Sequence, residues 1–217
     1  MDIKLNKYID HTLLKPDACM SDIETLCHKA IEHDFYSVCV NSRWVPLCAS
    51  ILKDSDVKIA AVAGFPLGAM SKESKAFEAC WACKEGAAEI DMVIDIGAMK
   101  SCMYDDVESD IKAVVDAASE HGGIVKVILE TGLLSDEEII KACELSEAAG
   151  AAFVKTSTGF GYGGAELDTV KLMRSSVSDS VSVKASGGIR DKKTALAMIE
   201  AGADRIGTSS GIKIVSE

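Results

Sequence analysis

The stretch Phe153-Val-Lys-Thr-Ser-Thr-Gly-Phe-Gly-Tyr-Gly-Gly164 begins like a β-strand and ends in a loop rich in glycine. Phe153 and Val154 predict a buried strand, yet the next residue is a lysine. A buried ammonium group must be paired, be neutral or take part in chemistry, because removing its charge from water is costly. The glycines that follow allow the backbone to approach a ligand closely, as phosphate binding requires. We therefore interpret the rest of the chain as a scaffold for Lys155.

Short apolar runs alternate with amphipathic runs along the whole sequence. The predicted strands are Ile9–Leu13, Ser37–Asn41, Lys58–Phe65, Glu89–Asp95, Ile124–Glu130, Phe153–Thr158, Ser182–Ser186 and Arg205–Thr208. The predicted helices are Ser21–His33, Ser71–Glu85, Tyr104–His121, Ser135–Ala149, Glu166–Arg174 and Lys192–Ala201. Strict alternation of strands and helices indicates parallel strands joined by right-handed crossovers. About eight such units in 217 residues predict an α/β protein, a single (β/α)8 TIM barrel over residues 1–217.

An open, doubly wound sheet is the alternative fold for this alternating pattern. No Gly-x-Gly-x-x-Gly segment follows an early strand, which argues against a dinucleotide-binding sheet. The chain has only 3 prolines and no low-complexity tract, so the sequence indicates neither a linker nor a domain boundary.

Charge and hydropathy narrow the classes of partner. A formal net charge of −11 argues against binding to nucleic acid or to an anionic membrane surface. No apolar run is long enough to cross a bilayer, and the first five residues, Met1–Leu5, lack the form of a signal peptide. We therefore expect a cytoplasmic protein. A small anionic substrate stays possible, because a pocket can be locally positive on an acidic protein.

The 8 cysteines include one C-x-x-C pair, formed by Cys80 and Cys83 within a predicted helix. A structural zinc site needs four converging ligands, and neither a second cysteine pair nor a matching histidine spacing accompanies this one. We therefore expect no metal site and interpret the cysteines as reduced, mostly buried apolar residues.

Polar side chains inside the predicted strands are the candidates for chemistry, because barrel active sites lie at the carboxyl ends of the strands. They are Asp91, Lys126, Lys155 and Lys184. Like charges in a poorly solvated site lower each other's pKa, and a neutral amine forms imines with aldehydes and ketones. The alternative is that each lysine only pairs with a carboxylate such as Asp91. Three lysines and an aspartate on neighbouring strands favour the imine, but this reasoning does not choose among the lysines.

Four further polar or thiol residues receive structural interpretations. Asp95 and Glu130 end predicted strands and are interpreted as caps or ion-pair partners. His11 has two interpretations, a residue that faces the site or a hydrogen-bonded structural histidine, and we interpret Cys39 as part of a pocket wall.

Three glycine-rich loops predict a phosphate site. They are Gly159–Gly164 after the Lys155 strand, Gly187-Gly188-Ile189-Arg190 after the Lys184 strand, and Gly207–Gly211 after the last strand. Exposed backbone N–H groups and hydroxyls bind phosphate, and in TIM barrels this site commonly follows strands seven and eight.

With these residues in view, the chain resembles the deoxyribose-phosphate aldolases of the shorter bacterial and archaeal type. The resemblance runs nearly from end to end. Its motifs are Ile9-Asp-His-Thr-Leu-Leu-Lys-Pro16, Val38-Cys-Val-Asn41 with Arg43 and Pro46, Gly64-Phe-Pro-Leu-Gly68, Glu89-Ile-Asp-Met-Val-Ile94, Val125-Lys-Val-Ile-Leu-Glu-Thr-Gly132, Phe153-Val-Lys-Thr-Ser-Thr-Gly-Phe160, Val183-Lys-Ala-Ser-Gly-Gly-Ile-Arg190 and Arg205-Ile-Gly-Thr-Ser-Ser-Gly211.

The resemblance implies a class I aldolase without metal or cofactor that cleaves 2-deoxy-D-ribose 5-phosphate reversibly to D-glyceraldehyde 3-phosphate and acetaldehyde. By this analogy Lys155 forms the imine, while Asp91 and Lys184 move protons and Lys184 helps to keep Lys155 neutral. Further implied site residues are Gly187, Gly188, Ser209 and Ser210 for the phosphate, and Cys39, Lys126, Thr156 and Gly159 around the pocket. The family also implies a homodimer or homotetramer.

Three positions depart from the family pattern: Glu166 replaces a common threonine, Asp95 a common asparagine and Ala88 a common aspartate. Glu166 would weaken phosphate binding if it faced inward. No tyrosine follows the last strand within Gly211–Glu217, where longer relatives carry one that helps proton transfer. Two other functions stay open: an imine-forming aldolase acting on a different sugar phosphate, and a non-catalytic barrel that binds a sugar phosphate.

Overall fold

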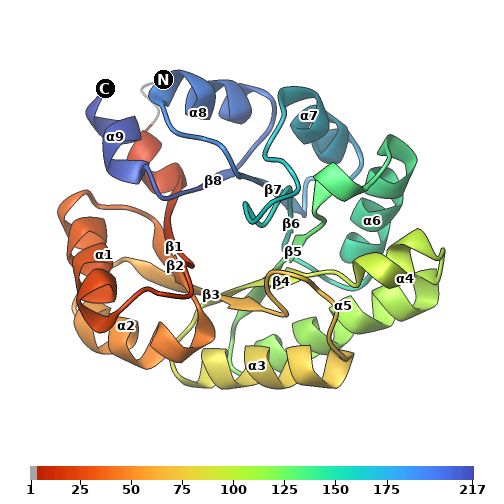
Figure 1. Ribbon diagram of the computed structural model, residues 1–217, viewed down its shortest axis with the longest axis horizontal. Helices are drawn as coiled ribbons and strands as arrows, with labels where there is room; N and C mark the ends of the chain where they lie inside the picture. Colours follow the sequence, from red (N-terminus) through yellow and green to blue (C-terminus); the bar gives the residue numbers. More distant parts are fainter. Residues whose placement is uncertain (1–3) are drawn as a thin grey trace.

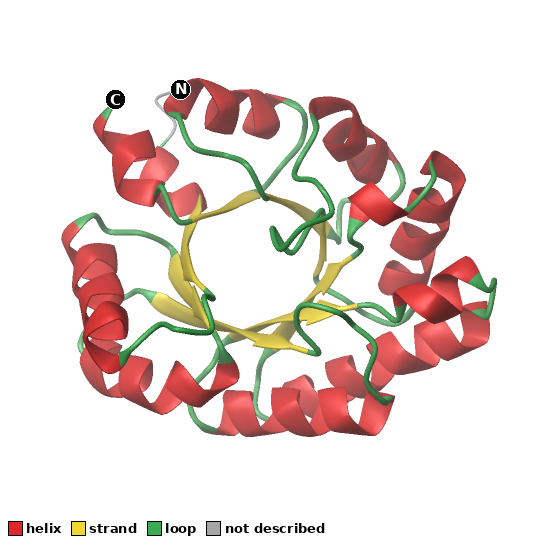
Figure 2. Cartoon of the chain, viewed as in Figure 1, coloured by secondary structure: helices red, strands yellow, loops and turns green. Residues whose placement is uncertain are grey.

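The structure, a computed structural model that describes residues 4–217, is a closed barrel of eight parallel strands in sequential order, surrounded by helices (Figures 1 and 2). The strands are β1 (Ile9–Leu13), β2 (Ser37–Val40), β3 (Lys58–Ala63), β4 (Glu89–Val93), β5 (Ile124–Ile128), β6 (Phe153–Lys155), β7 (Ser182–Ser186) and β8 (Arg205–Thr208). β1 pairs with both β2 and β8, so the sheet closes on itself. The predicted TIM barrel is confirmed, and the open doubly wound alternative is wrong.

Five strands end earlier than the sequence predicts, at Val40, Ala63, Val93, Ile128 and Lys155. The residues after these points leave the ladder and build loops. Asp95 accepts a hydrogen bond from the backbone N–H of Ala98 (2.9 Å) and caps a short helix. Glu130 has φ of 55° and accepts hydrogen bonds from Thr158, which steadies the loop after β6. Neither carboxylate pairs with a lysine among the residues described.

The predicted helices are confirmed with small changes at their ends. The helices are α1 (Met20–Glu32), α2 (Val45–Leu52), α3 (Lys72–Lys84), α4 (Ile96–Lys100), α5 (Tyr104–Ser119), α6 (Asp136–Ala148), α7 (Leu167–Ser175), α8 (Lys192–Glu200) and α9 (Gly211–Ser216). The sequence analysis missed α2, α4 and α9, because short helices show too few turns for an apolar period to be recognised. Ser135 and Glu138 form a capping box at the start of α6.

Two apolar regions of different size support the barrel. The larger one lies between the strands and the helices and contains, for example, Ile90, Val127 and Val183, all fully buried. A small second cluster consists of Leu14, Cys39, Ala60 and Val62. Within residues 4–217, the structure has no helix that is long and apolar enough to span a membrane.

A buried ion pair joins α3 to α5 outside the barrel. Lys75 Nζ lies 2.6 Å from Asp110 Oδ2 and donates a second hydrogen bond to the carbonyl oxygen of Val93 (3.0 Å) at the end of β4. The Lys75 side chain is 0% exposed and that of Asp110 6%. Burial raises the pKa of Asp110 despite the neighbouring lysine. Such a pair contributes little net stability, but breaking it leaves one buried charge without a partner.

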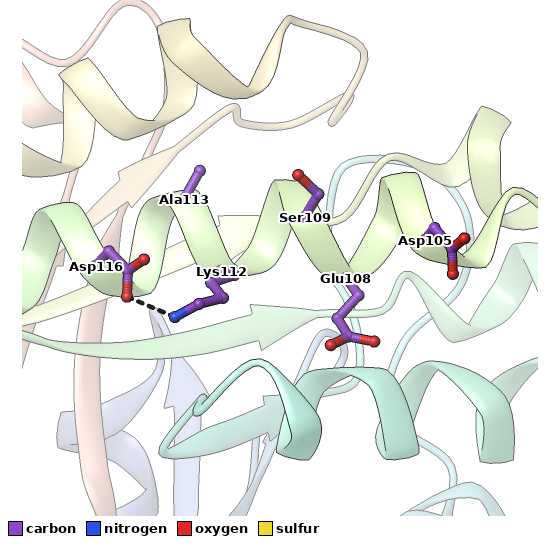
Figure 3. A pocket seen from close by; sticks show the side chains of 6 residues that line it. All are labelled: Asp105, Glu108, Ser109, Lys112, Ala113 and Asp116. Carbon is purple, nitrogen blue, oxygen red and sulfur yellow. Dashed lines mark hydrogen bonds and ion pairs between the residues drawn. The ribbon is translucent and has the colours of Figure 1, made fainter.

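We predict that Asp110→Asn lowers the free energy of unfolding by about 3 kcal/mol, because Lys75 then stays buried without a counter-charge. The matched control is Asp116→Asn on the same helix, where Asp116 pairs with Lys112 on the exposed side (2.9 Å; Figure 3). That change is expected to cost less than about 1 kcal/mol. Urea denaturation followed by circular dichroism measures both. Equal losses in the two variants would contradict the prediction.

Candidate active site

Charged side chains from six strands meet inside the barrel. They are Asp10, Glu89, Asp91, Lys126, Lys155, Lys184 and Arg205, and each is at least nine-tenths buried. The parallel register explains why they meet: Asp91 lies opposite Lys126, and Lys184 lies between Lys155 and Arg205. Barrel closure then brings β1, which carries Asp10, beside β8.

Asp91 is the centre of this network. Its Oδ1 accepts a hydrogen bond from Lys126 (2.7 Å), and its Oδ2 accepts one from Lys155 (2.8 Å) and one from Lys184 (2.7 Å). Burial alone would raise the pKa of Asp91, but the three lysines hold it well below its usual value. Asp91 is therefore an ionised carboxylate shared by three amines.

The other two carboxylates, Glu89 and Asp10, pair with Lys126, Lys184 and Arg205. Glu89 lies 2.5 Å from Lys126 and 3.3 Å from Arg205. Asp10 lies 2.5 Å from Lys184 Nζ and 2.9 Å from Arg205 Nη1. Among residues 4–217, Lys155 has an ion pair with Asp91 alone.

Three carboxylates thus face four cationic side chains, so the network carries one positive charge too many if all are ionised. Removing the proton of Lys155 balances the charges. Burial and the charge of Lys184 lower the pKa of Lys155, although Asp91 opposes the shift. The network therefore favours a neutral amine at this one position.

The remaining two lysines behave in the opposite way. Burial disfavours the charge of Lys184, but Asp10 and Asp91 together raise its pKa above the usual value. Lys126 is likewise desolvated, yet Asp91 and Glu89 raise its pKa. The sequence-based expectation that the lysines lower each other's pKa is therefore correct for Lys155 and wrong for the net shifts of the other two, because it omitted Asp10 and Glu89.

A cavity of about 440 Å³ opens at the carboxyl ends of the strands and reaches Lys155. Asp91, Lys126 and Lys184 contact one another behind Lys155 and do not line the cavity. A slightly larger hollow, about 460 Å³, lies on the outer face of α5 (Figure 3). Its lining comes from that single helix and includes the exposed Lys112–Asp116 pair, so no set of side chains converges there. The cavity at Lys155 is the candidate active site.

The glycine loops form the outer part of this cavity. Gly159, Gly187, Gly188 and Ser209 line it. Phosphate binding by Gly187, Gly188 and Ser209 stays a prediction. Ser210 does not line it; its backbone N–H donates to Thr208 Oγ1 (2.9 Å), at the start of α9. α9 begins at Gly211, directly after Ser210, and a role of Ser210 in phosphate binding stays a prediction.

Backbone conformation explains why glycines occupy two of these loops. Gly187 and Gly188 have φ of 92° and 79°, a region that other residues rarely adopt. The loop after β6 packs directly on them: the N–H of Ala165 donates to Gly187 O (3.0 Å), and a Cβ on Gly164 would come within 2.5 Å of that oxygen. In Figure 1 this loop, drawn in teal, projects from the β6–β7 side of the barrel toward its centre.

Comparison with known proteins agrees with this site. A family model described as DeoC/LacD family aldolase matches residues 4–217. The chain belongs to the DeoC/LacD aldolase family. It is 59% identical over 213 residues to the deoxyribose-phosphate aldolase of Bdellovibrio bacteriovorus, covering 98% of this chain and 96% of that protein. It is 60% identical over 213 residues to the deoxyribose-phosphate aldolase of Finegoldia magna, with coverages of 98% and 99%.

A solved structure gives the same result. The chain matches a deoxyribose phosphate aldolase from Aeropyrum pernix, described as having a unique tetrameric structure, with a TM-score of 0.91 and 35% identity. The match covers 98% of this chain and 89% of that one. The resemblance inferred from the sequence motifs is therefore confirmed.

Two predicted pocket residues of this aldolase support the site without lining the cavity. Thr156 Oγ1 donates to Ser186 O (2.9 Å) and accepts from the N–H of Ser186 (3.0 Å), which joins the ends of β6 and β7. Cys39 Sγ lies 3.9 Å from Asp91 Oδ2. Burial, together with Asp91, raises the pKa of the Cys39 thiol to about 11, so this group stays protonated at neutral pH.

Two other residues lie outside the aldolase site. The His11 ring lies at a tilt of 47° to that of Phe35, with 5.1 Å between ring centroids, and burial lowers its pKa to about 4. Its Nδ1 has no hydrogen-bond partner within residues 4–217, so the expectation of a hydrogen-bonded histidine is not met at this atom. Glu166 is exposed and does not line the cavity, so it does not face the phosphate loops as one alternative had it.

The sequence analysis missed several functional candidates of this aldolase. Asp10, Glu89 and Arg205 complete the charge network, and the cations Lys15 and Arg190 line the cavity beside the glycine loops. One signal was available for Glu89: it lies two residues before Asp91, so strand alternation places both on one face. No local pattern links Asp10 to Arg205, because 195 residues separate them.

We predict opposite pKa shifts for Lys155 in two variants of this aldolase. Asp91→Asn lowers the pKa further, because Asp91 favours the charged amine, whereas Lys184→Met raises it, because Lys184 disfavours that charge. Heteronuclear NMR of isotope-labelled lysine side chains, titrated with pH, measures both shifts. The exposed Lys112 serves as an internal reference. Shifts of the same sign in the two variants would contradict the charge-balance account.

Proposed function

We propose that this protein is a deoxyribose-phosphate aldolase, which cleaves 2-deoxy-D-ribose 5-phosphate reversibly to D-glyceraldehyde 3-phosphate and acetaldehyde through an imine on Lys155. One observation carries the proposal: of the three lysines around Asp91, only Lys155 both lines the cavity and has a lowered pKa. The names of the relatives at 59% and 60% identity support the substrate.

The reaction begins with attack of the neutral Lys155 amine on the C1 aldehyde of the substrate. Uptake of one proton, from the charged Lys184 or from solvent, and loss of water then give a protonated imine, which restores a positive charge at this position. Asp91 Oδ2, 2.8 Å from Lys155 Nζ, is placed to stabilise this charge. The protonated imine accepts the electron pair of the C2–C3 bond when that bond breaks, leaving an enamine on Lys155 and releasing glyceraldehyde 3-phosphate.

Two groups beside Lys155 would carry the protons. The C3 hydroxyl must lose a proton as the bond breaks, and the enamine carbon must gain one before hydrolysis releases acetaldehyde and restores the amine. Asp91 is an ionised acceptor, and Lys184 is kept charged by Asp10 and Asp91, so it can donate. We assign proton transfer to this pair, acting through water in the cavity.

The substrate phosphate would occupy the outer part of the cavity. Gly187, Gly188 and Ser209 offer backbone N–H groups or a hydroxyl there, and Lys15 and Arg190 offer positive charge. With the phosphate held there, the distance from the outer part of the cavity to Lys155 would select a sugar phosphate long enough for its aldehyde to reach the Lys155 amine. A homodimer or homotetramer is our expectation for the assembly, supported by the tetramer described for the relative from Aeropyrum pernix.

We predict that borohydride reduction in the presence of acetaldehyde places an ethyl group on Lys155. The physical reason is that Lys155 is the neutral, accessible amine of the network. Peptide mass mapping identifies the modified residue, and Lys155→Met is expected to lose both the adduct and, by on the order of a thousandfold or more, the aldol activity. Lys112→Met, on the outside of α5, is the matched control.

The same experiment separates the alternatives. An adduct on Lys126 or Lys184 would keep the imine mechanism and overturn the assignment of the amine. No adduct, in a folded protein that binds sugar phosphate, would support a non-catalytic barrel. Turnover of another sugar phosphate without release of acetaldehyde would indicate an aldolase with a different donor.

We predict that Arg190→Met raises KM for 2-deoxy-D-ribose 5-phosphate by about fivefold, since an exposed ion pair is worth up to about 1 kcal/mol. KM for the unphosphorylated sugar should stay unchanged, because that substrate lacks the group that Arg190 would contact. Steady-state kinetics on both substrates measure the difference, with Arg43→Met, outside this cavity, as the control. An equal effect on both sugars would place the phosphate elsewhere.

A further inference from the structure

A second cluster of reactive side chains lies far from Lys155 along the barrel axis. Cys80 on α3 and the neighbouring residues Glu120 and His121, just after α5, bring one thiol, one carboxylate and one imidazole together. Because α3 and α5 end where β4 and β5 begin, this cluster lies at the amino ends of the strands. The active-site cavity opens at the opposite ends.

The distances in this cluster suit a transition metal. The three ligand atoms all lie within 4.8 Å of one another, and Cys80 Sγ is 3.5 Å from His121 Nε2. In a tetrahedral zinc site, a thiolate at about 2.3 Å and an imidazole nitrogen at about 2.05 Å from the metal are about 3.6 Å apart. The pair therefore needs little movement to bind an ion. Thiolate, imidazole and carboxylate together are ligands that zinc accepts.

The backbone holds His121 in place. The N–H groups of His121 and Gly123 both donate to the carbonyl oxygen of Ala118, at 3.1 and 3.0 Å, so the turn after α5 is tight. Gly122 has φ of 75°, and Gly123 packs so closely on α3 that a Cβ there would lie 2.5 Å from Cys83 Sγ. This contact fixes the turn against the helix that carries Cys80. The site is thus built by packing between two elements.

Electrostatics and exposure also favour a cation. The carbonyl ends of α3 and α5 both point toward this end of the barrel, and helix C-termini carry partial negative charge. Cys80 is half-buried, whereas Glu120 and His121 are exposed, so an ion can enter from solvent. Burial, and to a smaller extent the neighbouring Cys80, raises the pKa of the Cys83 thiol to about 11. A metal binds the thiolate form, so the raised pKa makes Cys83 a poor ligand.

We propose that Cys80, Glu120 and His121 form a peripheral binding site for Zn²⁺ or a similar divalent transition metal, with water as the fourth ligand. The sequence led us to expect no metal site at the C-x-x-C pair, and Cys83 is indeed buried and is not part of this cluster. The fitting partner, His121, lies 41 residues away. A bound ion would tie α3 to the turn that leads into β5, and it would stabilise the folded protein because it binds the folded state alone.

The test is titration of the untagged, reduced, full-length protein with Co²⁺ and then with competing Zn²⁺. We expect one ion per chain and the ultraviolet absorption of a thiolate–cobalt bond, which Zn²⁺ removes. Cys80→Ser should abolish this absorption. His121→Gln and Glu120→Gln should each weaken Zn²⁺ binding on the order of tenfold or more.

Matched controls are Cys102→Ser and His28→Gln, which remove an exposed cysteine and an exposed histidine elsewhere on the surface. Both should bind metal like the unchanged protein. Zn²⁺ should raise the melting temperature of the unchanged protein and leave that of Cys80→Ser unaltered. Thiolate–cobalt absorption that survives in Cys80→Ser, or equal Zn²⁺ affinity in the cluster variants and the controls, would overturn the proposal.

Aldol activity in the presence of a chelator separates this proposal from the proposed function. Cys80→Ser should retain full activity there, because the cluster lies at the opposite end of the barrel from Lys155. If the unchanged protein is active but binds no metal, only the peripheral site is contradicted. If it binds metal but is inactive, only the aldolase proposal is contradicted.

Discussion

The carboxylate of Asp91, shared by three buried lysines, is the interaction on which the active site depends. Without it, Lys155 would lie in a region that excludes water with no counter-charge, and Lys126 and Lys184 would each lose one carboxylate partner. Lys126 pairs with Asp91 and Glu89, and Lys184 pairs with Asp91 and Asp10. Lys155 is then the cation in excess of the three carboxylates. The electrostatics that allow the barrel to fold around these charges therefore also make Lys155 the lysine with the lowered pKa.

Barrel closure is what makes this arrangement possible. Asp10 on β1 contacts Arg205 on β8 and Lys184 on β7, so strands from opposite ends of the sequence share one carboxylate. In an open sheet β1 and β8 would not be neighbours, and Lys184 would lose the partner that keeps it charged. The same closure gathers the loops after β6, β7 and β8 around one cavity. The fold thus supplies both the charge balance and the binding space.

The two ends of the barrel differ in how their side chains are held. At the carboxyl ends, buried ion pairs fix the lysines, and glycines with positive φ bring the loops close together. At the amino ends, close packing of Gly123 on Cys83 fixes a turn whose polar side chains point to solvent. This separation means that changes at the peripheral cluster need not disturb the chemistry at Lys155.

The sequence by itself determined the alternation of strands and helices, hence the barrel. It also indicated Asp91, the three strand lysines and the glycine loops as candidates, because these features depend on periodicity and local residue type. Only the tertiary structure decided which lysine has the lowered pKa, because that depends on carboxylates such as Asp10 that reach the site across 174 residues of sequence. It also decided that Ser210 lies outside the cavity, since the short helix after β8 carries it away. Periodicity is a local property of the chain, whereas charge balance in a closed interior is a property of all its strands together.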